Sequence, residues 1–143
     1  MRFRLPRPAL IAATGLAALG LLAATPAAAQ APGAAPQYTE AQVRAFLVGF
    51  YGDHGPSEKD RIYKVTEELK KKASETEEYD LLLCAQNTPD TVRIGKVTTE
   101  ASAATGWAQV TPVFSGGTQS HLTAYVGLDA SKPMKLSDIT CDL

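Results

Sequence analysis

The chain has 143 residues, and its 14 basic and 15 acidic side chains give a formal net charge of −1 at pH 7. A chain of this length, once a leader is removed, holds one domain with one hydrophobic core. The slight acidic excess excludes a nucleic-acid or anionic-membrane surface, because both need clustered positive charge.

The chain begins with a pattern typical of a secretory signal peptide. Three arginines form its positive end: Arg2, Arg4 and Arg7. An apolar stretch follows over residues 9–24, and a small-residue run over residues 26–29 has the Ala-x-Ala pattern at which signal peptidase cuts. We therefore predict a signal peptide over residues 1–29, which leaves a mature protein with 11 basic and 15 acidic side chains and a formal charge of −4. The apolar stretch is short and rich in alanine, which favours cleavage over the alternative of an uncleaved membrane anchor.

Residues 30–37 are rich in Pro, Gly and Ala and predict a flexible tether, which leaves residues 38–143 as the single folded domain. The first helix is expected to begin after Thr39, which has capping-box spacing to Gln42. The apolar residues that follow at helical spacing are Val43, Phe46, Leu47, Phe50 and Tyr51. This pattern predicts an amphipathic helix that packs one side on the core and ends at Gly52.

A second helix is expected to begin after Ser57, as its N-cap, and to end near Ala73. Its narrow apolar stripe consists of Ile62, Val65 and Leu69. A polar, acidic segment over residues 74–78 follows. Residues 79–86 are then an apolar run whose length fits either a short buried strand or a buried helical turn.

From residue 91 onward, the apolar side chains follow the two-residue period of β-strands. Four strands are expected, over residues 91–99, 107–114, 121–128 and 134–141. Gly95 interrupts the alternation of the first strand and predicts a bulge there. Residues 115–118, Ser-Gly-Gly-Thr, predict a hairpin turn, and one face of the sheet should pack against the helices. Helices followed by antiparallel strands are typical of the α+β class.

The chain has two cysteines, Cys84 and Cys141. An exported protein works in the periplasm or the extracellular medium, where conditions are oxidising, and two cysteines permit one intramolecular pairing. We therefore predict a Cys84–Cys141 disulfide that joins the middle of the chain to its last strand. A redox pair is the alternative, but the chain lacks the Cys-x-x-Cys spacing typical of that chemistry.

Three segments carry a resemblance to a known family: residues 46–51 (Phe-Leu-Val-Gly-Phe-Tyr), 79–87 (Tyr-Asp-Leu-Leu-Leu-Cys-Ala-Gln-Asn) and 134–141 (Met-Lys-Leu-Ser-Asp-Ile-Thr-Cys). Over residues 40–142 the chain resembles an uncharacterised family of small exported bacterial proteins, a domain of unknown function, in the nuclear-transport-factor-2-like, or cystatin-like, superfamily. The resemblance implies two or three N-terminal helices packed on a curved four-stranded antiparallel sheet, a cone-like fold with a concave pocket. The chain departs from the family at Met134, where an aromatic residue is usual, and at Asn87 and Ser137, where acids are found. The family has no established activity.

The cone-like fold implied by the resemblance suggests two candidate catalytic carboxylates. The last strand can aim Asp138 at the cavity, where burial would raise the carboxyl pKa and suit it to proton transfer. Asp80 is the second candidate, and the alternative for both is that they accept hydrogen bonds or face water. The aromatic side chains that could line a ligand pocket, or else fill the core, are Tyr51, Tyr63, Tyr79, Trp107 and Tyr125. We expect no bound metal or cofactor, because the chain lacks the residue spacings of known metal-binding and cofactor-binding motifs.

These features favour an exported, soluble binding or interaction module whose ligand, a small molecule or another envelope protein, is unknown. The lack of any known catalytic motif favours this reading over an enzyme. One alternative is a small cone-fold enzyme that performs acid–base chemistry on a small hydrophobic molecule, with Asp138, Asp80 or Tyr51 as its polar groups. Another is an inhibitor or immunity-type partner of an envelope protein. The open face of the sheet also allows a homodimer.

Overall fold

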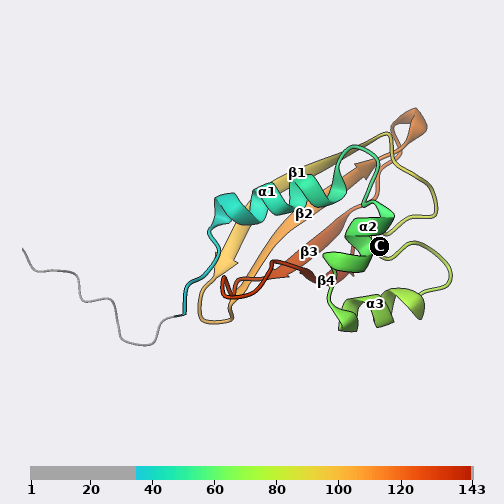
Figure 1. Ribbon diagram of the computed structural model, residues 1–143. Helices are drawn as coiled ribbons and strands as arrows, with labels where there is room; N and C mark the ends of the chain where they lie inside the picture. The colour runs from blue at the N-terminus through green and yellow to red at the C-terminus, as the bar shows by residue number, and fades with distance from the viewer. Residues whose placement is uncertain (1–34, 143) are drawn as a thin grey trace, which may run out of the picture. The chain divides into compact units, whose positions relative to one another are not determined.

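The computed structural model describes residues 35–142, so the predicted signal peptide over residues 1–29 lies outside the described residues. Within this part of the chain, three helices come first: α1 (Glu40–Tyr51), α2 (Glu58–Tyr63) and α3 (Glu67–Ser74). Four strands follow: β1 (Thr91–Glu100), β2 (Thr105–Val113), β3 (Leu122–Gly127) and β4 (Leu136–Cys141). The strands form one antiparallel sheet in the order β1-β2-β3-β4, which does not close into a barrel, and the predicted α+β class is confirmed (Figure 1).

The first helix forms as predicted, with a complete capping box. The Gln42 backbone N–H donates a hydrogen bond to Thr39 Oγ1 at 3.3 Å, and the Thr39 N–H donates to Gln42 Oε1 at 2.9 Å. Both bonds satisfy backbone donors that a helix N-terminus otherwise leaves unpaired. The helix ends at Gly52, whose φ of 52° lies in the left-handed region that favours glycine. The buried side of α1 consists of Val43, Leu47, Phe50 and Tyr51.

The predicted single helix over residues 57–73 is wrong, because the chain divides it into α2 and α3. The Leu136 N–H donates to the Lys64 carbonyl at 2.8 Å, and the Thr66 N–H donates to the Leu136 carbonyl at 3.0 Å. Val65, between them, is buried and pairs in parallel with the start of β4. Backbone groups that bond to a strand are no longer free to bond within a helix. This short segment therefore covers the outer edge of β4 and separates the two helices.

The apolar run over residues 79–86 is neither a strand nor a helix but a tight turn. The backbones of Asp80 and Ala85 pair, and the Leu82 N–H donates to Asp80 Oδ1 at 3.0 Å. The side chains that the turn buries in the core are Leu81, Leu82 and Leu83. The turn therefore supplies core residues without contributing to the sheet.

The predicted disulfide between Cys84 and Cys141 is confirmed, with Cα atoms 5.7 Å apart. It joins the turn over residues 79–86 to the last residue of β4. Cys84 has a φ of 48°, in the left-handed region that side chains other than glycine rarely adopt. The turn and the covalent bond together hold this conformation.

The predicted bulge at Gly95 is confirmed by the pairing of β1 with β2. Their register shifts between Ile94 and Val97. A Cβ atom at Gly95 would lie 3.1 Å from the Gln109 carbonyl oxygen, and this close approach favours glycine. Arg44 Nη1, from α1, donates to the carbonyls of Ile94 and Gly95 at 3.3 and 2.9 Å. The guanidinium therefore covers the middle of the outer edge of β1.

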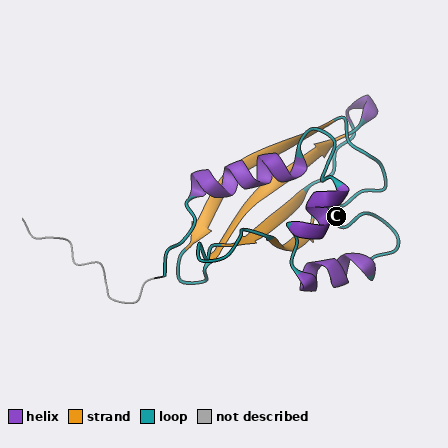
Figure 2. Ribbon diagram, in the orientation of Figure 1, coloured by secondary structure: helices purple, strands orange, loops and turns teal. Residues whose placement is uncertain are grey.

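The alternation of side chains gives the sheet two different faces. The buried residues of the inner face are Val97, Ala108, Val110, Leu122, Ala124, Val126, Leu136 and Ile139. The helix α1 lies over this inner face, and the core fills the space between them (Figure 2). The side chains that alternate with them point to the outer face, where they are half-buried or exposed. The outer face is thus free of any covering layer formed by residues 35–142.

Two residues of the predicted tether bond to the folded part of the chain. The Ala130 N–H donates to the Pro36 carbonyl at 2.9 Å, and Gln37 Nε2 donates to the Ala101 carbonyl at 3.0 Å. The first bond holds residue 36 against the connection between β3 and β4, and the second holds residue 37 against the connection between β1 and β2. Among residues 35–142, no helix has the length and apolar character that crossing a membrane requires.

Candidate functional site

Three of the predicted site residues lie in one row on the outer face of the sheet. The strand register pairs Thr98 of β1 with Trp107 of β2, and Trp107 with Tyr125 of β3. Tyr125 in turn pairs with Asp138 of β4. The sheet therefore brings together two side chains expected to bind a ligand and one carboxylate expected to take part in chemistry.

Trp107 and Tyr125 form the centre of this row. Their ring centroids lie 6.3 Å apart, and the ring planes are tilted by 37°. Directly opposed aromatic side chains on neighbouring strands stabilise a sheet by about 0.2–1 kcal/mol. Both side chains are only half-buried, because no helix packs above them. The pair therefore keeps part of its ring surface available to another molecule.

A second row of polar side chains lies beside the aromatic pair. The register pairs Gln109 of β2 with Thr123 of β3, and Thr123 with Thr140 of β4. Gln109 and Thr140 are exposed, and Thr123 is half-buried. No motif in the sequence marks these three residues, and only the strand register brings them together. We call the two rows together the aromatic face, and it consists of Thr98, Trp107, Gln109, Thr123, Tyr125, Asp138 and Thr140.

Asp138 forms the margin of the aromatic face and is half exposed, with 53% of its side-chain surface accessible. Lys72 Nζ, from α3, donates to Asp138 Oδ1 at 2.8 Å and to the Ile139 carbonyl at 2.9 Å. The Ile139 N–H also donates to Asp138 Oδ1, at 2.8 Å. The carboxylate is therefore not inside a cavity, and its charge is balanced by a lysine at hydrogen-bonding distance.

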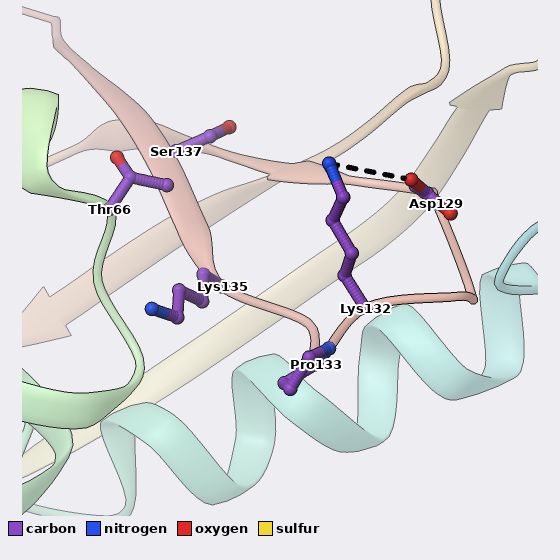
Figure 3. Close-up of a pocket in the computed structure, with 7 residues that line it drawn as sticks. Thr66, Asp129, Lys132, Pro133, Lys135 and Ser137 are labelled. Atoms are coloured by element: carbon purple, nitrogen blue, oxygen red, sulfur yellow. Dashed lines mark ion pairs between the residues drawn. The ribbon is translucent and has the colours of Figure 1, made fainter.

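A surface pocket with a volume of about 430 Å³ borders the outer face where β3 leads into β4. Its lining residues are Thr66, Gly127, Asp129, Lys132, Pro133, Lys135 and Ser137 (Figure 3). Gly127 lies two residues after Tyr125 on the same face of β3. Lys132 Nζ lies 3.8 Å from Asp129 Oδ2. The Ser131 hydroxyl and N–H, with a smaller contribution from Lys132, hold the pKa of Asp129 below its ordinary value.

Asp80, the other candidate carboxylate, is bound on two sides and anchors the turn to α2. Arg61 Nη1 donates to Asp80 Oδ1 at 3.1 Å, and Arg61 Nη2 donates to Asp80 Oδ2. The Leu82 N–H also donates to Asp80 Oδ1. A bidentate arginine pair of this kind is a strong, directional contact, and it fixes the position of the carboxylate. The geometry gives Asp80 a structural role.

Tyr51 lies near this ion pair and is completely buried. Burial raises the pKa of the Tyr51 hydroxyl well above its ordinary value. The negative charge of Asp80 raises this pKa further, and the positive charge of Arg61 lowers it. No residue of the described part of the chain forms a hydrogen bond with this hydroxyl. A buried, unpaired hydroxyl destabilises the folded state by about 1–3 kcal/mol.

Replacement of Tyr51 by phenylalanine is therefore expected to raise the free energy of unfolding by about 1 kcal/mol, because the unpaired hydroxyl is removed and the ring remains. Urea denaturation followed by circular dichroism measures the change. The matched control is Tyr38→Phe, which removes a hydroxyl that donates to the Lys132 carbonyl and should lower stability. A loss of stability in Tyr51→Phe comparable to that of the control would contradict the prediction.

The two remaining aromatic candidates lie apart from the aromatic face. Tyr63 is on α2 and is 66% exposed. Tyr79 is half-buried, and its hydroxyl lies 4.0 Å from Cys141 Sγ, next to the disulfide. Neither residue shares a surface with Trp107 or Tyr125. Of the five aromatic candidates, only the pair on β2 and β3 comes together at the surface.

Within residues 35–142, no group of three or more His, Cys, Asp and Glu side chains is placed to hold a metal ion. No family model, curated protein or solved structure matches the chain. The arrangement on the aromatic face offers ring surface, hydroxyl groups and an amide. These are groups that bind a ligand, and the one carboxylate of the face, Asp138, is paired with Lys72.

Proposed function

We propose that this chain is an exported, soluble binding module that holds another molecule on the aromatic face. In this proposal residues 1–29 are a signal peptide, and the mature protein works in the periplasm or the extracellular medium. The disulfide supports this proposal, because such bonds persist in oxidising compartments. We also propose the cone-like fold of the nuclear-transport-factor-2-like superfamily, which the antiparallel sheet with helices on one face supports.

The observation that carries the proposal is the half-buried pair of Trp107 and Tyr125 at the centre of an uncovered sheet face. Tryptophan and tyrosine combine a large apolar ring with a polar group, and they are enriched where proteins bind other molecules. Removing such a pair from water on binding gains more than burying the threonines around it. Their central position is also where binding energy is usually concentrated.

Binding fits the geometry better than acid–base catalysis does. Asp138 is neutralised by Lys72 at the surface, and Asp80 is held by a bidentate arginine. A general acid or base needs access to a substrate in a cleft. Neither carboxylate lines the pocket beside Gly127.

Trp107 is the only tryptophan of the chain, so its fluorescence reports on the proposed site alone. We expect an envelope extract of the producing cells to protect Trp107 of the purified protein from quenching by acrylamide. Tyr125→Ala keeps the reporter and removes its aromatic neighbour, so the extract should be at least about tenfold less effective with this variant. The matched control is Tyr63→Ala, which removes an exposed aromatic ring outside the aromatic face and should behave as the wild type.

The proposal fails if the extract gives no protection to the wild type at any concentration. It also fails if the folded Tyr125→Ala variant is protected as well as the wild type. Circular dichroism verifies that both variants are folded before they are compared.

A further inference from the structure

We propose that the molecule held on the aromatic face is a neutral polysaccharide. This inference rests on the proposed function, since it names the ligand class of the same site. Three properties of the face lead to it: the geometry of its aromatic rings, its hydrogen-bonding side chains and its small net charge.

The aromatic rings suit the shape of a sugar. Trp107 and Tyr125 lie side by side across two strands, with centroids 6.3 Å apart and planes tilted by 37°. Neither ring lines the pocket beside Gly127, so the pair offers a platform on the open side of the sheet rather than a deep pocket. Pyranose rings have flat faces made of C–H groups, and such faces pack on aromatic rings, whose surfaces carry partial negative charge. A platform of this kind binds successive sugar units of a chain better than it binds a small apolar molecule, which needs a concave site.

The groups around the platform suit the hydroxyls of a sugar. The side chains of Thr98, Gln109 and Thr140 are exposed, and that of Thr123 is half-buried. Threonine hydroxyls donate and accept, and the glutamine amide does both through separate atoms. Sugar hydroxyls likewise donate and accept, so each sugar hydroxyl can form hydrogen bonds with side chains of this surface. These side chains extend over all four strands, which matches a ligand longer than one or two units.

The charge of the surface disfavours the other classes of partner. Asp138 is paired with Lys72, and the charged side chains of β1 are Arg93, Glu100 and Lys96, which is exposed within the bulge. These three side chains leave one net positive charge, which gives an anionic polymer little electrostatic attraction because such binding needs clustered basic side chains. Protein interfaces usually have a core of large apolar side chains. On this face the apolar groups are the aromatic pair and Val113 at the end of β2, and polar residues surround the pair.

The pocket beside Gly127 gives the bound chain room to continue. It begins two residues beyond Tyr125 and has a volume of about 430 Å³. Its lining includes the hydroxyl residues Thr66 and Ser137 (Figure 3). A polysaccharide that lies across the aromatic pair can therefore place a further unit or a branch in this pocket.

The test uses purified protein and the polysaccharide fraction of the producing cells' envelope, freed of protein by protease, of nucleic acid by nuclease and of lipid by extraction. We expect this fraction to protect Trp107 from acrylamide quenching, and periodate oxidation of the fraction to abolish the protection. Two variants should bind at least about tenfold more weakly than the wild type: Tyr125→Ala, and Gln109→Ala, which changes one exposed side chain and should fold normally. Tyr63→Ala should bind as the wild type.

Three results would overturn the inference. In the first, the untreated extract protects Trp107 and the protease-treated extract does not. The aromatic face would then bind a protein, and the proposed function would stand. The second is a decrease in the quenching of Trp107 by acrylamide as the protein concentration rises without any extract, together with a dimer mass in light scattering. A second copy of the chain would then occupy the face. The third is the absence of protection by any extract, treated or untreated, which would also remove the proposed function.

Discussion

Replacement of both Cys84 and Cys141 by alanine is expected to lower the free energy of unfolding by about 4 kcal/mol. The disulfide closes a loop of 57 residues, and for a loop of this length the loop-closure entropy removed from the unfolded chain corresponds to about 4 kcal/mol. Small domains have total stabilities of about 5–15 kcal/mol, so this loss is a large share of the whole. The variant should therefore unfold at a clearly lower urea concentration than the wild type.

Urea denaturation of the oxidised wild type and the double variant, followed by the fluorescence of Trp107, measures this difference. Wild-type protein treated with a thiol reductant is the control and should unfold at nearly the same urea concentration as the variant. A stability difference below about 1 kcal/mol between oxidised wild type and variant would show that the bond contributes little, against the loop-closure argument.

Phe50→Ala is expected to lower the free energy of unfolding by about 3–5 kcal/mol, as large-to-small changes of buried aromatic residues do. Phe50 is 1% exposed, and it packs against Phe46 and Tyr51 with ring centroids 5.9 and 5.1 Å away. Truncation removes these contacts and leaves a cavity that the surrounding core cannot fully close. Urea denaturation followed by circular dichroism gives the magnitude.

The matched control for Phe50→Ala lies on the same helix. Val48 is 49% exposed, so Val48→Ala should change the free energy of unfolding by no more than about 0.5 kcal/mol. Equal effects of the two substitutions would mean that α1 does not bury the side that holds Phe50. The comparison therefore tests the orientation of the helix as well as the energy of the core.

The sequence predicts those elements that depend on neighbouring residues. The capping box of Thr39 and Gln42 and the apolar spacing after it are local signals, and α1 follows them. The bulge at Gly95 and the alternation in the strands are local in the same way. The disulfide was predictable because the chain has two cysteines and a leader pattern that predicts export. None of these predictions required knowledge of a distant contact.

The errors have their origin in contacts between distant parts of the chain. Val65 leaves the helical pattern because β4, far along the sequence, binds the backbone on either side of it. Asp138 was expected to face a cavity because the resemblance implied one, and the sheet instead places it on the outer face beside Lys72. Alternation alone assigns a strand residue to a face, but it does not say which face the helices cover.

The candidate site likewise has residues that the sequence predicts and residues that only distant contacts bring together. The sequence identified Trp107 and Tyr125 as aromatic candidates but could not distinguish them from Tyr51, which lies in the core. Strand register decides that two of the five candidates are neighbours, and register depends on the whole sheet. The threonines and the glutamine of the aromatic face carried no signal on their own, because exposed polar residues on strands are common.

Both edge strands of the sheet are partly covered against strand addition. The Arg44 guanidinium binds two carbonyls at the bulge of β1, and the backbone of residues 64–66 binds the start of β4. Unprotected edge strands allow identical chains to join into growing fibrils. These contacts interrupt both edges, which disfavours polymerisation through the backbones, and the broad side of the sheet is left for encounters with other molecules.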